Sequence, residues 1–149
     1  MKLYSYFRSS ASYRVRIALQ LKGLEPDYIP VHLVRREQLL REHIALSPDG
    51  LVPVLEVGGD ILTQSMAIIE YLEETCPTPA LLPESAVDRA HVRALAQSIA
   101  CEIHPLNNLR VLSYLVKEIK VDEETKMAWY HHWVRFGLEA FERQLASHA

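Results

Sequence analysis

The sequence has little cysteine and no long hydrophobic run. Its two cysteines, Cys76 and Cys101, lie far apart and form no Cys-x-x-Cys pair, which argues against a zinc ribbon, a dithiol redox motif and a disulfide framework. Such sparse cysteine suits a reducing compartment, so we expect a cytoplasmic protein. No apolar segment approaches the length needed to cross a bilayer. The N-terminal MKLYSYFRSS lacks the apolar core of a signal peptide, so we expect no membrane partner.

A marked excess of one sign of charge is also missing. The chain has 16 basic and 19 acidic residues, a formal net charge of −3, and 49% hydrophobic residues among its 149. A chain with this charge has no overall field that would attract nucleic acid or an anionic membrane. Its apolar content is enough to build one domain or two small ones.

Residues 1–79 alternate strand and helix signals. The order of these signals is β-α-β-α-β-β-α, in which a parallel β-α-β pair precedes a hairpin and a helix. This order predicts a thioredoxin-like α/β domain. The expected strands lie at 2–6, 27–33, 54–57 and 61–63, and the expected helices lie at 12–22 (capped by Ser12), 36–46 and 66–76 (capped by Ser65).

A proline-rich linker, PTPALLPESA (77–86), precedes an all-α region at 85–149. There we expect one long helix over 86–119, capped by Ser85, and a second that starts at Asp122 and runs to the chain end. Two helices make a poor independent core, and the helical pattern continues to the last residues. We therefore expect this domain to be incomplete or to depend on a partner.

The turn between the first strand and the first helix, RSSASYR (8–14), brings three serine hydroxyls and two guanidiniums together. A helix N-terminus beside the carboxyl ends of strands favours a bound anion. A hydroxyl there can donate to a thiolate and lower the pKa of the thiol. Since the turn contains no cysteine, that thiol would belong to a cofactor. The alternative is that Ser9, Ser10 and Ser12 only cap the helix.

Two stretches near the predicted hairpin could bind an extended ligand. A cis bond between Val52 and Pro53 would turn the main chain of Val52 outward, free to pair with a peptide. Gln64 and Ser65 lie where the last strand meets the next helix and could hold a carboxylate. Alternatively, Ser65 is an ordinary helix cap.

The stretch CEIHPLNNLRVL (101–112) is unusual for a long helix. Pro105 removes one helical hydrogen bond and should kink the helix there. His104, Asn107, Asn108 and Arg110 cluster around the kink, either for function or as structural residues. By contrast, His131-His132 lacks an HExxH pattern, so we expect no metal site.

Together these stretches resemble the zeta-class glutathione transferases, the family of maleylacetoacetate isomerase, and the related maleylpyruvate isomerases are similar as well. The family signature Ser-Ser-Cys-Ser-aromatic-Arg-Val-Arg-Ile-Ala-Leu aligns with SSASYRVRIAL. LVPVL, QSMAIIEYLEETCPTPALLP and IHPLNNLRVL match in order and spacing, so the resemblance covers essentially the whole chain. Ala11 stands where the family has cysteine, and the family's later C-terminal helices are missing.

The resemblance implies the architecture of a glutathione transferase, with glutathione as cofactor and a homodimer as the assembly. The Val52 backbone would pair with the cysteinyl part of glutathione, and Gln64 and Ser65 would hold its γ-glutamyl end. Ser9, or alternatively Ser10, would activate the thiol. The implied glutathione-binding positions are Ser9, Ser10, Ala11, Ser12, Tyr13, Arg14, Gln38, Val52, Gln64, Ser65, His104, Asn108, Leu109 and Arg110.

The implied activity is cis–trans isomerisation of maleylacetoacetate to fumarylacetoacetate, in tyrosine and phenylalanine catabolism. Addition of a thiolate makes the double bond single, and rotation and expulsion of the thiolate then give the trans isomer. Arg8 and Arg110 would receive the two carboxylates of the substrate. The alternatives are a maleylpyruvate isomerase, a general transferase for small electrophiles, and a non-catalytic protein that binds a partner.

Overall fold

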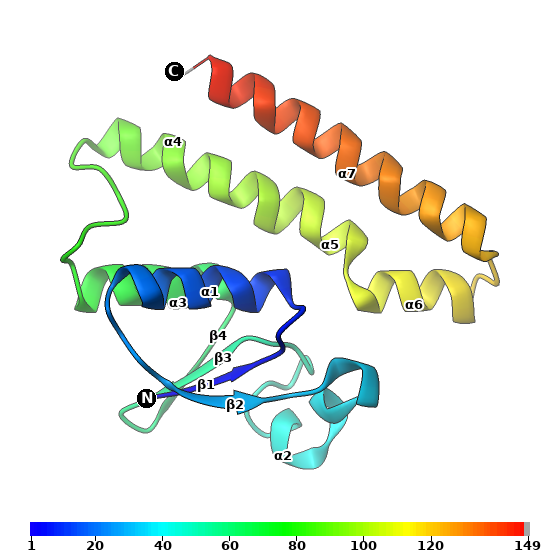
Figure 1. The fold of residues 1–149 in the computed structure, drawn as a ribbon, viewed down its shortest axis with the longest axis horizontal. Helices are drawn as coiled ribbons and strands as arrows, with labels where there is room; N and C mark the ends of the chain where they lie inside the picture. Colours follow the sequence, from blue (N-terminus) through cyan, green and yellow to red (C-terminus); the bar gives the residue numbers. More distant parts are fainter. Residues whose placement is uncertain (148–149) are drawn as a thin grey trace. The chain divides into compact units, whose positions relative to one another are not determined.

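A four-stranded sheet lies at the centre of the first part of the chain (Figure 1). Its strands are β1 (Lys2–Ser5), β2 (Asp27–Pro30), β3 (Val54–Val57) and β4 (Asp60–Thr63), in the order β2-β1-β3-β4. β1 and β2 are parallel, whereas β3 runs antiparallel to both β1 and β4. The predicted thioredoxin-like topology is therefore confirmed.

The computed structural model describes residues 1–147. These residues form two units, Met1–Leu82 and a second unit that begins at Pro83. No helix among the described residues is both long enough and apolar enough to span a membrane. Within residues 1–147, no group of three or more His, Cys, Asp or Glu side chains could hold a metal ion.

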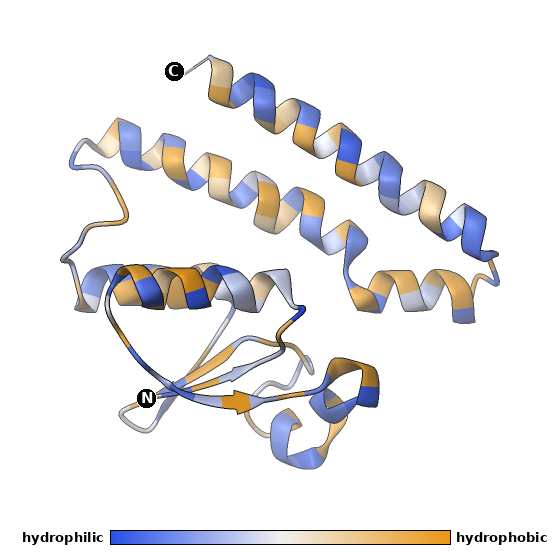
Figure 2. Cartoon of the chain, in the orientation of Figure 1, coloured by the Kyte–Doolittle hydropathy of each residue, from blue (hydrophilic) through white to orange (hydrophobic). Residues whose placement is uncertain are grey.

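The core of the first unit lies between the sheet and two helices, α1 (Ser10–Leu21) and α3 (Ser65–Thr75), which cover the same face (Figure 1). Hydrophobic and polar residues alternate along α1, as expected for a half-buried helix (Figure 2). The buried side chains of the core are Leu3, Val15, Ala18, Leu19, Leu55, Ile68 and Leu72.

Three expected helix boundaries were wrong. Ser9, rather than Ser12, is the N-cap of α1, because the Ser9 Oγ accepts the Ser12 N–H at 3.2 Å. Ser65 is the first residue of α3 instead of its cap, and Gln64 takes the cap position without a side-chain hydrogen bond. The helix expected over 36–46 is a 3-10 turn, Glu37–Leu39, followed by the short α2 (Arg41–Ile44), and another 3-10 turn, Leu33–Arg35, precedes it.

The interruption of that helix has a local cause. Arg36 adopts a left-handed conformation with φ of 63° and ψ of 26°, and Leu40 is extended. Neither conformation continues a right-handed helix. The pattern of polar and apolar residues was helical, but the backbone changes direction twice within it.

Lys22, at the end of α1, joins three segments of the first unit. Its side chain is fully buried and forms an ion pair with Glu73 of α3, and its Nζ donates to the Pro79 carbonyl at 2.8 Å. The Glu73 carboxylate also accepts the N–H groups of Leu81 and Leu82, at 3.0 to 3.1 Å. This ion pair therefore holds the start of the linker against α1 and α3.

The second unit is helical: α4 (Ala86–Gln97), a π-helical turn at Ser98–Ile103, α5 (His104–Asn107), α6 (Leu109–Lys117) and α7 (Glu123–Ala146). Ser85 caps α4 and Asp122 caps α7, as expected. A continuous helix over 86–119 was wrong, because Asn108 is extended and caps α6 with its own side chain. The π-helical turn at Ser98–Ile103, called the wide turn below, ends two residues before Pro105. Here the His104 N–H donates to the Ile99 carbonyl, five residues back.

α7 packs closely on the wide turn and on α5. At Gly137, a Cβ atom would come within 2.4 Å of Ile103, so this contact requires glycine. The Trp129 Nε1 donates to the Leu106 carbonyl at 2.9 Å. Even so, no described residue of the second unit is buried, in keeping with the expected lack of an independent core.

Candidate functional site

Three of the expected ligand-binding segments meet at one edge of the sheet. β1 and β4 end at this edge and β3 begins there, because β3 is antiparallel to both. Tyr4 pairs with Val54, which in turn pairs with Thr63. The turn after β1, the Val52–Pro53 bond before β3 and the start of α3 after β4 therefore lie side by side.

Ser9 caps α1 at this edge while keeping its hydroxyl proton available. Its backbone N–H donates to the Tyr6 carbonyl at 3.0 Å, and its Oγ accepts from Ser12. The cap uses an oxygen lone pair, so the hydroxyl proton can still be donated to a ligand. The partial positive charge of the helix N-terminus adds to this preference for an anion.

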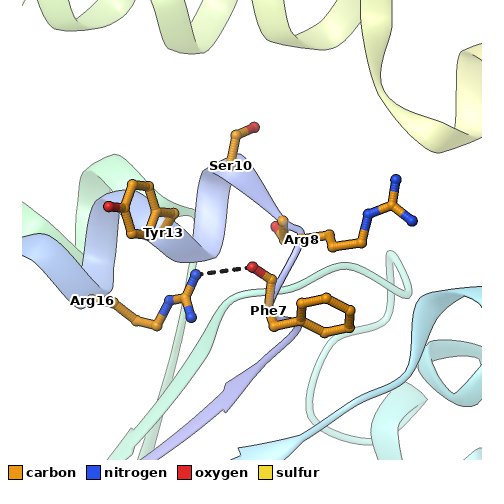
Figure 3. Close-up of a pocket in the computed structure, with 6 residues that line it drawn as sticks. Phe7, Arg8, Ser10, Tyr13 and Arg16 are labelled. Atoms are coloured by element: carbon orange, nitrogen blue, oxygen red, sulfur yellow. Dashed lines mark hydrogen bonds between the residues drawn. The ribbon is translucent and has the colours of Figure 1, made fainter.

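An open pocket of about 320 Å³ lies over this turn (Figure 3). Its Arg16 Nη2 donates to the Phe7 carbonyl at 3.1 Å, and the Arg16 guanidinium lies 5.1 Å from the centre of the Tyr13 ring. The Arg8 side chain points away from Tyr13 and Arg16 (Figure 3). The lining residues are Phe7, Arg8, Ser9, Ser10, Tyr13 and Arg16.

Sequence reasoning missed two of these lining residues, Phe7 and Arg16. Arg16 follows Tyr13 by three residues, a spacing that places both on one face of a helix, and this signal was available. Phe7 reaches the pocket because it precedes the turn and is 63% exposed. An exposed phenylalanine cannot be recognised from a strand pattern alone.

The Val52–Pro53 peptide bond is cis, as expected. Val52 is buried and belongs to a small apolar cluster with Tyr6 and Val31, which fixes its side chain. Across from it, Gln64 has φ of 68° and ψ of 114°. A non-glycine residue in this region is strained, and such strain is frequent at ligand sites.

The remaining expected positions of the first unit differ in accessibility. Ser12 is fully buried, and neither it nor Ala11 or Arg14 lines the pocket. Gln38 lies in the second 3-10 turn, and its Oε1 is buried without a hydrogen-bond partner among the described residues. A buried acceptor of this kind is costly unless a ligand supplies a donor.

The expected positions of the second unit lie around α5 and α6. His104 begins α5, whereas Leu109 and Arg110 are exposed at the start of α6. Each amide atom of Asn108 makes one hydrogen bond within the unit, since its Oδ1 accepts from Val111 at 3.0 Å and its Nδ2 donates to the Pro105 carbonyl at 3.1 Å. A second N–H and a second oxygen lone pair remain for a ligand. Both amide atoms of Asn107 are buried without a partner in the described part of the chain.

Comparison with known proteins gives close relatives. Residues 1–74 match the family model for the N-terminal domain of glutathione S-transferases. A maleylpyruvate isomerase of a Ralstonia species is 51% identical over 98% of this chain and 69% of its own length. The chain thus spans about two thirds of this relative.

Solved structures agree with this match. The holo structure of a maleylpyruvate isomerase, a bacterial zeta-class glutathione S-transferase, has a TM-score of 0.95 and 51% identity, covering 98% of this chain and 69% of that one. Maleylacetoacetate isomerase from Methylobacterium extorquens AM1, solved with malonate and glutathione, has a TM-score of 0.95 and 39% identity over the same shares. On this sequence identity and this fold, the chain belongs to the zeta-class glutathione transferase family.

Proposed function

We propose that this chain binds glutathione at the sheet edge and uses it to isomerise the cis double bond of a maleyl diacid. The observation that carries the proposal is the convergence of Ser9, the Val52 main chain and the Gln64–Ser65 helix start at that edge. An extended γ-glutamyl tripeptide needs such a set of groups: a donor for its sulfur, a free main chain and a site for its carboxylate.

Glutathione, when bound, supplies the thiolate that adds to the double bond and leaves after rotation. Ser9 donates its hydroxyl proton to the sulfur and so favours the thiolate. Val52 pairs through its main chain with the cysteinyl part, and Gln38 offers its unpartnered oxygen to a donor of the ligand. The α3 N-terminus, at Gln64 and Ser65, holds the γ-glutamyl carboxylate.

We assign binding of the substrate carboxylates to Arg8 and Arg110, and we assign glutathione contacts to His104, Asn108 and Leu109. Arg8 lines the pocket beside Ser9, which supports an acidic substrate. The relative from Methylobacterium extorquens binds malonate, a small diacid, together with glutathione. Our preferred substrate is maleylacetoacetate, and maleylpyruvate is the alternative. Steady-state rates on both compounds decide between them.

Other functions remain distinguishable by simple measurements. A general transferase would conjugate small neutral electrophiles and would not need either arginine. A protein that only binds a partner would not be retained on glutathione resin, whereas an isomerase and a general transferase would both be retained.

Ser9→Ala is expected to raise the pKa of the bound glutathione thiol by about one to two units. A hydrogen bond to a charged group contributes roughly 1.5–3 kcal/mol, and that contribution is lost from the thiolate only. Thiolate absorbance titrated against pH in the presence of saturating glutathione measures the change.

Two further variants make this test specific. Ser85→Ala removes an equivalent helix cap elsewhere, and it should leave the thiol titration unchanged. Ser10 is the rival for activation of the thiol. A normal titration in Ser9→Ala, together with a raised thiol pKa in Ser10→Ala, would transfer the role to Ser10.

We also propose that the protein is a cytoplasmic homodimer. The proposal rests on the family resemblance and on the apolar side chains that the second unit exposes, among them Tyr114 and Phe136 at 58% and 61%. Sedimentation equilibrium at micromolar concentration should give twice the mass of one chain. A single-chain mass across that range would contradict the dimer.

A further inference from the structure

The segment before cis-Pro53 is held by a histidine that the proposed chemistry does not use. Residues from the end of α2 to the start of β3 form neither helix nor strand, so their backbone groups need other partners. His43 is 5% exposed, and its Nε2 lies 2.8 Å from the Leu51 carbonyl oxygen. Because a carbonyl can only accept, Nε2 must carry the proton and donate.

This hydrogen bond determines where the Val52 N–H points. The Leu51 carbonyl and the Val52 N–H belong to one planar peptide unit, in which they point in opposite directions. The bond that precedes Val52 is trans, since the described cis bonds are only Val52–Pro53 and Thr78–Pro79. Fixing the carbonyl toward His43 therefore fixes the N–H on the opposite side.

The surroundings of His43 hold its ring in place. The ring makes an edge contact with Tyr4 of β1, with centroids 6.4 Å apart. Its Nδ1 is buried and has no hydrogen-bond partner among residues 1–147. Within this range the ring therefore makes one hydrogen bond, which is the one to the Leu51 carbonyl.

We propose that His43 is a positioning residue of the glutathione site, which orients the Val52 N–H toward the cysteinyl carbonyl through the Leu51 peptide. This inference rests on the proposed function, since it takes glutathione as the ligand that pairs with Val52. His43 touches neither the ligand nor the substrate and acts only through the peptide unit that it holds.

The test uses the full chain and two replacements of the histidine. His43→Phe keeps a ring against Tyr4 and loses the donor. His43→Gln places an amide N–H₂ group at the same number of bonds from Cα as Nε2 and can still donate. Glutathione affinity by calorimetry should fall about three- to tenfold in His43→Phe and stay near that of the parent in His43→Gln.

A second ligand separates positioning from general loss of structure. In an analogue of glutathione whose cysteinyl carbonyl oxygen is replaced by sulfur, the acceptor for the Val52 N–H is weaker. The parent and His43→Gln should bind this analogue several-fold less tightly than glutathione, whereas His43→Phe should bind both ligands about equally. Equal binding would mean that the affinity of His43→Phe no longer depends on the strength of the cysteinyl acceptor. A histidine with a merely structural role would not give this result.

Ser47→Ala is the matched control in the same segment. The Ser47 Oγ accepts the Leu51 N–H at 3.3 Å, and that N–H belongs to the preceding peptide unit. The control should keep the preference of the parent for glutathione over the analogue. Loss of the preference in Ser47→Ala as well would overturn the specific role of His43.

The remaining outcomes are equally decisive. Unchanged glutathione affinity in His43→Phe, or an undiminished preference for glutathione over the analogue in that variant, overturns the proposal for His43 alone. If His43→Phe does not fold, a folded His43→Gln that has lost the preference overturns it too. A parent that binds no glutathione at all overturns the proposed function and this inference together.

Discussion

Arg8→Ala and Arg110→Ala are each expected to lower kcat/KM for a maleyl diacid by about thirty- to a thousandfold. A guanidinium holds a carboxylate through two charge-assisted hydrogen bonds, and loss of one such contact removes roughly 2–4 kcal/mol of transition-state binding. Conjugation of a neutral electrophile by the same variants should stay near that of the parent, because that substrate offers no carboxylate.

The control for this experiment is Arg35→Ala, which removes an exposed arginine at the end of the first 3-10 turn. It changes the net charge equally and should affect neither reaction. If Arg8→Ala and Arg110→Ala lowered both activities in parallel, the arginines would serve glutathione binding or the fold. Isomerisation would then lose its main independent support.

Lys22→Met is expected to destabilise the first unit by about 2–4 kcal/mol. Removing one partner of a buried ion pair leaves the other charge without compensation, and the loss of the hydrogen bond to Pro79 adds to this cost. Methionine keeps the unbranched stem, so the change reports the ammonium group. Hydrogen exchange measured on peptides of α1 and α3 should accelerate by roughly the corresponding thirty- to a thousandfold.

The matched control is Lys2→Met, which breaks a lysine–glutamate pair that is 46% and 27% exposed. Exposed ion pairs contribute little to stability, so hydrogen-exchange rates should change far less in Lys2→Met than in Lys22→Met. Glu73→Gln combined with Lys22→Met should recover part of the lost stability, because the unpaired charge is then gone. Equal effects of Lys2→Met and Lys22→Met would show that burial of the second pair does not matter.

Glu73 also predicts a pH dependence of this stability. Burial acts to raise the pKa of Glu73, but hydrogen bonds from Lys22 and from the Leu81 and Leu82 amides outweigh it, so the pKa lies below its ordinary value of 4.5. The stabilisation is therefore complete above pH 4.5 and is lost as the pH falls through the lower, folded-state value. In Lys22→Met, exchange rates should change less over this acidic range than in the parent.

The sheet and both covering helices could be predicted from sequence because their signals are local and agree with one another. A Gly-Gly turn joins β3 to β4, and α1 carries buried residues at helical spacing. The segment 36–46 could not be predicted, because Arg36 takes a left-handed conformation, which is uncommon for an arginine. Local propensity gives no warning of such a residue.

The site was predictable in part, for a similar reason. A proline before a buried strand is visible as letters, and the family resemblance then implied the cis bond at Pro53. Serines before the first helix are visible too, but Ser12 was expected as the cap that Ser9 forms. The partner of the Leu51 carbonyl could not, because His43 lies eight residues away in a segment expected to be a plain helix. Asn108 was expected in a ligand site, and its capping of α6 became visible only once the helix break was known.

The wide turn at Ser98–Ile103 limits how related chains can differ in length. Each helical residue rotates the chain by about 100°, so inserting or deleting one residue in the turn would rotate α5 by about that angle. Leu106 would then turn its carbonyl away from the Trp129 Nε1, and Ile103 would leave the space beside Gly137. Substitutions that keep the residue count preserve both contacts. Evolution is therefore freer to change the residue types in this turn than to change their number.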